Sequence, residues 1–372
     1  MYLIASKLCL QQILTAHFLT LDVYNGWIDY QKESNMTINA KVESIPTFPL
    51  NKLDFPKLSL GIHPYDGVSY KSDTEDNKNL KLFSTVSSIT EVMCHAVQNF
   101  GFSYVQVDHM NPDLNRLHLQ AIWETERRLK TSLGLVAYIL IPINLNGENI
   151  SYSDRTHATL FKYDISAVGE QEYLAHIKRD KILEYTVGGT LNNLVTPKTT
   201  NPYSMTEAER FEIDYSRLEE HLSFFHGANV LVADSGAEID LLAATGRFDL
   251  IKEYLGFLKT RFATVISSVH HAGITIPLIE EHGIDFDGYI VPINHPGMYM
   301  FPTKERVISA VRGTNKPVIA IKPLAGGRYL GEKAFEYVLN EVCAESVMFG
   351  MGTIDQVTET ASAARSVIGL TN

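Results

Sequence analysis

The sequence is poor in cysteine, short of positive charge and without an uninterrupted apolar run that could span a membrane. Its three cysteines are scattered and form no C-x-x-C pair, which excludes a disulfide framework and a cysteine zinc site and predicts a reducing, cytoplasmic setting. The net charge of −11 argues against nucleic-acid binding, which requires a basic surface. A small-molecule substrate, even an anionic one held in a local positive pocket, remains compatible with it.

The most apolar stretch lies at the amino terminus, over residues 1–21, where Gln11, Gln12 and His17 interrupt it. It is too broken for a secretory signal and too short for a membrane span, so we expect no membrane partner. Two interpretations stay open. The segment forms an amphipathic helix packed on the rest of the protein, or Met36 is the natural start. We assign residues 1–50 to an N-terminal helical extension.

From residue 51 onward, apolar strand-like runs alternate with helical stretches, which predicts an α/β fold with a parallel sheet. Eight alternations are the number that a closed (β/α)8 TIM barrel requires, and residues 51–372 suit one such domain. The expected strands cover residues 57–63, 104–108, 135–141, 230–234, 264–270, 288–294, 318–322 and 346–349.

Residues 144–204 break this alternation, because they are polar and hold a Gly188-Gly189 pair. We expect a long, irregular insertion after the third strand. Such an insertion would emerge at the carboxyl ends of the strands, where it could form a lid or wall of the active site. The alternative is a structural elaboration without a functional role.

Polar side chains follow most of the expected strands, at the end where barrels place their active sites. They are His63, Asp108, His109, Asn144, Asp234, Ser235, His270, His271, Asn294, His295 and Lys322. A desolvated lysine can bind an anion or act as acid, base or imine-former, and an acid that ends an apolar strand needs a partner. We therefore take Asp108, Asp234, His270 and Lys322 as candidate catalytic residues. A structural ion pair of the lysine with one of the acids is the alternative.

A metal site is not expected, although His63, Asp108, Asp234 and His270 could supply ligands. The sequence contains no H-x-H or H-E-x-x-H spacing around these positions, and adjacent histidines in an extended strand point to opposite sides.

The last two expected strands run directly into glycine. Glycine lets backbone N–H groups approach an anion, and the N-terminus of the following helix adds a partial positive charge. Thr353 and Gln356 have capping-box spacing at the start of the last helix. The candidate cofactor-binding residues are Gly326, Gly327, Arg328, Gly350, Gly352, Thr353 and Asn294.

These segments, Lys322-Pro323-Leu324-Ala325-Gly326-Gly327-Arg328 and Gly350-Met351-Gly352-Thr353, resemble the C-terminal quarter of the aldo-keto reductase superfamily. Residues 55–61 resemble its opening strand, and residues 101–108 resemble its second strand, which ends in the catalytic aspartate. The resemblance implies a TIM barrel that binds NAD(P) and reduces carbonyl compounds by hydride transfer, using an aspartate, a tyrosine, a lysine and a histidine.

Of that tetrad, only Asp108 stands where the family pattern places its residue. The third strand ends in Ile141-Pro142-Ile143 without a lysine, and the fourth ends in Asp234-Ser235 rather than histidine. The leading hypothesis is an NAD(P)-linked oxidoreductase acting on a small carbonyl or hydroxyl compound. The alternatives are a lyase, isomerase or hydrolase built on the same strand-end residues, and a ligand-binding barrel without catalysis.

Overall fold

The computed structural model describes residues 42–150, 154–186 and 203–370 of the chain. The expected N-terminal helix and the choice between Met1 and Met36 lie outside the described residues. No helix of the described part is long and apolar enough to cross a membrane.

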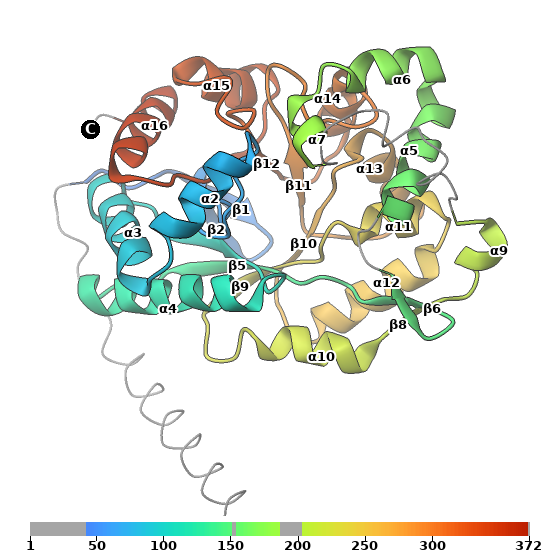
Figure 1. Cartoon of the computed structure of the whole chain (residues 1–372), viewed down its shortest axis with the longest axis horizontal. Coiled ribbons are helices and arrows are strands. Elements are labelled where there is room, and N and C mark those ends of the chain that lie inside the picture. Colours follow the sequence, from blue (N-terminus) through green and yellow to red (C-terminus); the bar gives the residue numbers. More distant parts are fainter. Residues whose placement is uncertain (1–41, 151–153, 187–202, 371–372) are drawn as a thin grey trace, which may run out of the picture.

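Eight parallel strands close into a barrel, which confirms the predicted α/β TIM-barrel fold (Figure 1). The last strand pairs with the first, Val347 opposite Leu58, and this pairing completes the ring. Each expected strand is one of the eight, with ends that differ by a few residues. In chain order they are β3 (Leu58–Leu60), β4 (Tyr104–Val107), β5 (Gly134–Tyr138), β9 (Val230–Asp234), β10 (Val265–Ser268), β11 (Tyr289–Pro292), β12 (Val318–Ile321) and β13 (Ser346–Phe349).

The interior of the barrel is a packed apolar core below the carboxyl ends of the strands. Its buried side chains alternate along the strands, as the two-residue period of a strand requires. A hairpin of β1 (Thr47–Leu50) and β2 (Leu53–Pro56) adds Leu50 and Phe55 to this core. The strands contribute Val136, Val232, Ile266, Ile290, Ile319 and Met348. The interior is therefore filled, and open space remains at the mouth.

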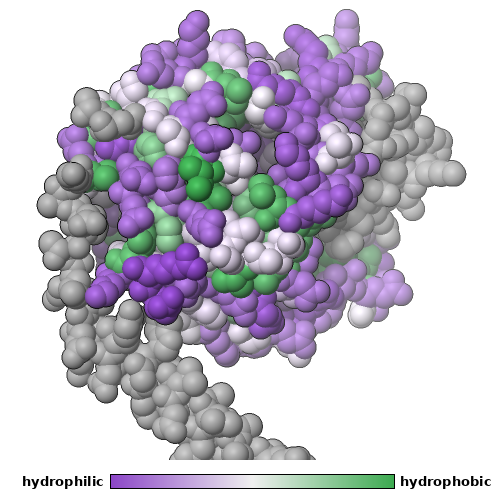
Figure 2. Space-filling model, turned by 60° about the vertical axis from the view of Figure 1, so that its left-hand side comes forward, coloured by the Kyte–Doolittle hydropathy of each residue, from purple (hydrophilic) through white to green (hydrophobic). Residues whose placement is uncertain are grey.

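Helices surround the barrel, and most of them bury apolar side chains against the strands, whereas α2 (Asp73–Leu82) has no buried residue. In α3 (Val86–Phe100) the Thr85 side chain accepts from the Ser88 amide at the start, and Gly101 ends the helix at φ +73°. The other surrounding elements are α4 (Pro112–Leu129), α11 (Glu238–Ala244), α12 (Phe248–Lys259), α13 (Ala272–Glu281), α14 (Lys304–Gly313), α15 (Glu332–Glu336), the π-helical turn η1 (Tyr337–Glu341) and α16 (Ile354–Val367). On the face shown in Figure 2, hydrophilic side chains surround smaller apolar patches.

The insertion between β5 and β9 is more regular than expected in its described parts. It holds a three-stranded antiparallel sheet and several helices, because apolar side chains such as Phe161, Tyr173 and Leu183 pack with Phe301 of the barrel. The strands are β6 (Ile143–Leu145), β7 (Glu148–Ile150) and β8 (Phe211–Ile213). The helices are α5 (Asp154–Val168), α6 (Glu170–Ile177), α7 (Lys181–Thr186), α9 (Met205–Ala208) and α10 (Tyr215–Ser223).

A buried polar contact also holds the insertion against the barrel. Nδ1 of His271, at the start of α13, lies 2.7 Å from a carboxylate oxygen of Asp164 in α5. Burial lowers the pKa of His271, but the charge and hydrogen bond of Asp164 and the charge of Asp240 together raise it more, so that the pKa lies above its ordinary value. His271 therefore anchors the insertion, and it does not line the cavity at the mouth.

Candidate functional site

A cavity of about 850 Å³ opens at the carboxyl ends of the strands. This is the end at which barrel enzymes carry their sites, and the volume is typical of a small-molecule or cofactor site. Asp108, His270 and Lys322 line it, together with Gly326, Gly327, Gly350 and Gly352. The sequence thus placed most of its candidates on one cavity, but Asp234, Asn294, Arg328 and Thr353 are not among the lining residues.

Lys322, directly after β12, lies between two tyrosine rings. Its Nζ atom is 5.1 Å from the ring centre of Tyr70 and 4.9 Å from that of Tyr299. Among the described residues, no carboxylate oxygen lies within 4.0 Å of Nζ. Burial lowers the pKa of Lys322 from 10.5 to about 8, and Asp180 and Asp66 offset part of that effect.

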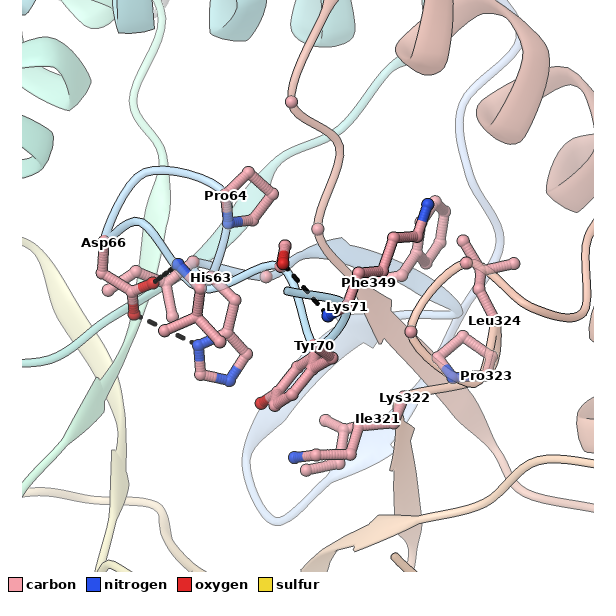
Figure 3. Close-up of a pocket in the computed structure, with 18 of the residues that line it drawn as sticks. His63, Pro64, Asp66, Tyr70, Lys71, Ile321, Lys322, Pro323, Leu324 and Phe349 are labelled. Carbon is pink, nitrogen blue, oxygen red and sulfur yellow. Dashed lines mark hydrogen bonds and ion pairs between the residues drawn. The ribbon is translucent and has the colours of Figure 1, made fainter. Parts of the chain in front are cut away.

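These aromatic contacts extend across the mouth. The His63 and Tyr70 rings meet edge to face at 5.1 Å, and the His270 and Tyr299 rings do so at 5.0 Å. His63, Tyr70, Lys322, Tyr299 and His270 therefore form one continuous row, which we call the mouth row. In Figure 3 the Tyr70 ring lies between His63 and Lys322. The row joins the loops that follow β3, β10, β11 and β12.

Three residues of the mouth row have a left-handed backbone, with φ of +57° at Tyr70, +61° at Tyr299 and +57° at Lys322. This conformation costs a non-glycine residue on the order of 1–3 kcal/mol and is found mostly where surrounding contacts impose it. Here the Tyr299 amide donates to an Asp180 carboxylate oxygen at 2.5 Å, and Arg328 Nη1 donates to the Tyr70 carbonyl at 2.8 Å. The sequence suggested that Arg328 clamps a phosphate. In the structure its side chain is exposed and holds the Tyr70 loop through this hydrogen bond.

Two carboxylates form the acidic end of the cavity. Asp66 lies 3.1 Å from Nδ1 of His63 and also accepts from the Val68 amide, whereas Asp108 accepts from the Met110 amide at 3.1 Å. Burial, followed by the nearby charge of Asp66, raises the pKa of Asp108 to about 6. Asp108 and Lys322 share the cavity, but no ion pair joins them. In the described part of the chain, no three histidine, cysteine, aspartate or glutamate side chains are placed to hold a metal ion.

Asp234 and Asn294 lie at the ends of their strands as expected, but both are fully buried and bonded to protein groups. The Asp234 carboxylate accepts from Ser268 Oγ at 2.6 Å and from the Ser268 amide at 2.9 Å, and burial raises its pKa to about 6. It therefore holds Ser268, which does line the cavity. Asn294 closes its own loop, with both side-chain bonds to Met298 at 2.8 Å.

The turn after β12 forms a wall of the cavity, in which two adjacent glycines carry no side chain. Gly326 and Gly327 have φ of +66° and +72°, which glycine adopts without strain. Within the described chain their amides donate to no protein acceptor. A Cβ built on Gly327 would lie 2.9 Å from Nζ of Lys71, so that ammonium group lies directly beside the turn. Backbone amides without a protein acceptor, in a turn with an adjacent cation, are suited to binding an anion.

The turn after β13 is less open to a ligand than the sequence suggested. A Cβ on Gly350 would lie 2.5 Å from Cδ of Pro64, so this glycine permits close packing of two loops. The Gly352 amide donates to Gln356 Oε1 at 2.8 Å, and Thr353 Oγ1 accepts from the Gln356 amide at 3.2 Å. Thr353 therefore caps α16 without lining the cavity, and the Gly352 amide already has a partner.

Part of the insertion forms a wall of the cavity. Tyr185 of α7 lines it, and its hydroxyl donates to Asp76 of α2 at 2.5 Å. The Tyr185 ring also contacts the Tyr70 ring at 6.0 Å. Sequence reasoning missed Tyr70, Tyr185 and Tyr299, because all three lie beyond the strand ends and no local pattern marks them.

Comparisons with known proteins found similarity only among solved structures. No family model matches the chain, and no curated protein matches it. A protein described as an aldo-keto reductase from Pseudomonas aeruginosa is 12% identical, with a TM-score of 0.46, over 91% of this chain and 99% of its own. An aldo-keto reductase of Bombyx mori, solved with NADP, is 11% identical, with a TM-score of 0.46, over 89% of this chain and 90% of its own. The chain is thus distantly similar to aldo-keto reductases, and this similarity concerns the fold alone.

Proposed function

We propose that the chain is an enzyme, an oxidoreductase that acts on a small carbonyl or hydroxyl compound with NAD(P) as its cofactor in the cytoplasm. One observation carries the proposal: Lys322, held in the mouth row with no carboxylate partner among the described residues, shares a single cavity with the glycine turn of Gly326 and Gly327. A group able to donate a proton and a wall suited to phosphate thus face the same space.

The residues present fit the cofactor. A volume of about 850 Å³ lies within the range of known cofactor sites, which runs from about 300 to about 1,000 Å³. The free amides of Gly326 and Gly327 and the ammonium group of Lys71 would hold the diphosphate. NAD(P)H bound there supplies a hydride, and the protein has to supply the proton.

Lys322 is the group best suited to give that proton. With a pKa of about 8 it is mostly protonated at pH 7, yet it releases a proton more readily than a lysine of pKa 10.5. Its ammonium group would donate a hydrogen bond to the substrate oxygen and then the proton itself. The Tyr70 and Tyr299 rings fix its position by cation–π contact.

The test combines cofactor binding with turnover. Calorimetric titration with NADH and NADPH should show binding to the wild-type protein, and Lys71→Met should weaken it roughly tenfold, as loss of a charge-assisted bond does. Lys252→Met, an exposed change on α12, is the matched control and should bind as the wild type does. Lys322→Met should retain binding but lose oxidation of NAD(P)H in a panel of small aldehydes and ketones. If neither nucleotide binds the wild-type protein, the proposal is wrong.

A further inference from the structure

We propose that Lys322 is an imine-forming lysine, whose amine condenses reversibly with the carbonyl group of a small aldehyde or ketone in the cavity at the mouth. This activity uses the cavity of the proposed function but needs no nicotinamide. It would serve a lyase or isomerase reaction, in which a bond next to the carbonyl carbon is broken.

Imine formation requires an amine that is neutral, accessible and not held by a carboxylate. Lys322 is partly buried and lines the cavity, so it can be reached from the mouth. The two tyrosine rings of the mouth row flank its ammonium group and offer no carboxylate. A lysine in such surroundings has a weakened preference for its charged form.

The two acids that act on Lys322 are bound to other groups. Asp180 accepts from the amides of Ile182 and Leu183 with one oxygen and from the Tyr299 amide with the other. Asp66 is held by His63 and by the Val68 amide. Neither comes within ion-pair distance of Nζ. Both carboxylates are thus held by hydrogen bonds to other protein groups, and neither of them ties up the Lys322 amine.

The protonation equilibrium of Lys322 favours the same chemistry. A pKa of about 8 in place of 10.5 gives on the order of 300 times as much neutral amine at pH 7 as an ordinary lysine has. Asp108 lines the same cavity, and its raised pKa of about 6 keeps a fraction of it protonated near neutral pH. A nucleophile and an acid are therefore available together.

The condensation balances as follows. The lone pair of neutral Nζ forms a bond to the carbonyl carbon, and the carbonyl π pair moves to oxygen. The oxygen takes up a proton and the positively charged nitrogen releases one, which gives a neutral carbinolamine. Asp108 then protonates the hydroxyl group, the C–O bond breaks, and water leaves as the nitrogen lone pair forms the C=N bond. Hydrolysis reverses these steps and returns the free amine.

Borohydride trapping tests the inference on the wild-type protein without nicotinamide. The protein is incubated with glycolaldehyde, or in a second arm with dihydroxyacetone, and is reduced with sodium borohydride, digested and mapped by mass spectrometry. At pH 7 we expect the Lys322 peptide to be alkylated at least 100-fold faster than Lys71, the exposed lysine of the same cavity. Its rate should rise with pH and level off above about pH 8.

Two comparisons make the outcome decisive. Lys304, which lies over the Tyr337 ring at 4.7 Å but outside this cavity, should label no faster than other lysines. Lys322→Arg keeps the charge and should abolish the fast adduct. An adduct spread evenly over the lysines, or a Lys322 rate that still climbs at pH 10, would overturn the inference. Failure of the nucleotide titration alone would leave it standing, which separates it from the proposed function.

Discussion

Lys322→Met should make the protein more stable at pH 7, because the fold holds a partly buried ammonium group with which no carboxylate of the described chain forms an ion pair. The lowered pKa, about 8 against 10.5, corresponds to about 3 kcal/mol of lost unfolding free energy below pH 8. The variant also loses the cation–π contacts with the two tyrosine rings, which reduces its gain in unfolding free energy by about 0.5–2 kcal/mol. We therefore expect a net gain of about 1–3 kcal/mol in the variant.

The gain should depend on pH in a defined direction. The folded-state pKa is the lower one, so between about pH 8 and 10.5 the unfolded chain binds more protons at Lys322 than the folded protein does. Wild-type stability therefore rises with pH across that window. The methionine variant lacks this rise, and its advantage should shrink toward pH 10.5.

Guanidinium denaturation at pH 7 and pH 10 measures both effects, with Lys252→Met as the control that should stay within about 0.5 kcal/mol of wild type. A Lys322→Met protein that is less stable than wild type by more than about 1 kcal/mol at pH 7 would refute the reasoning. Such a result would mark Lys322 as one half of a buried ion pair.

Three further changes probe the surroundings of the site. Asp108→Asn should remove a fall in stability of up to about 3 kcal/mol that the wild type shows as the pH rises from 3.8 to about 6, because the raised pKa of Asp108 makes the folded state bind more protons there; a pH series of denaturation curves checks this. Gly350→Val should cost about 1–3 kcal/mol in thermal melts even without ligand, since its Cβ would meet Pro64. His271→Ala breaks the buried contact with Asp164 and should cost about 3–5 kcal/mol at pH 6; a melt close to wild type would mean that this contact does not anchor the insertion.

The barrel was predictable because each strand is a local apolar run, and β9, β12 and β13 end within one residue of their expected limits. The helices of the insertion were not, since their apolar residues become a core only by packing on Phe301 of the barrel. Sequence alone found that strand-end polar residues gather at one end. The sequence did not predict that Asp234 accepts a hydrogen bond from Ser268 whereas Asp108 lines the cavity.

The mouth row shows the same limit more sharply. Tyr299 is placed by the hydrogen bond that its backbone amide donates to the Asp180 carboxylate. Asp180 is 119 residues away in sequence and belongs to the insertion. Tyr70 is placed by Arg328, 258 residues away. Such pairs leave no periodic pattern in the sequence, because each depends on two loops meeting in three dimensions.

The measurement that tests the central claim most directly is the titration of Lys322 itself by NMR, on protein carrying ¹³C-labelled lysine, with Lys322→Arg used to assign its signal. A signal absent from the variant and titrating near pH 8 would support a reactive lysine at the mouth. A Lys322 signal titrating near pH 10.5 with the other lysines would contradict both the proton-donor and the imine-forming roles.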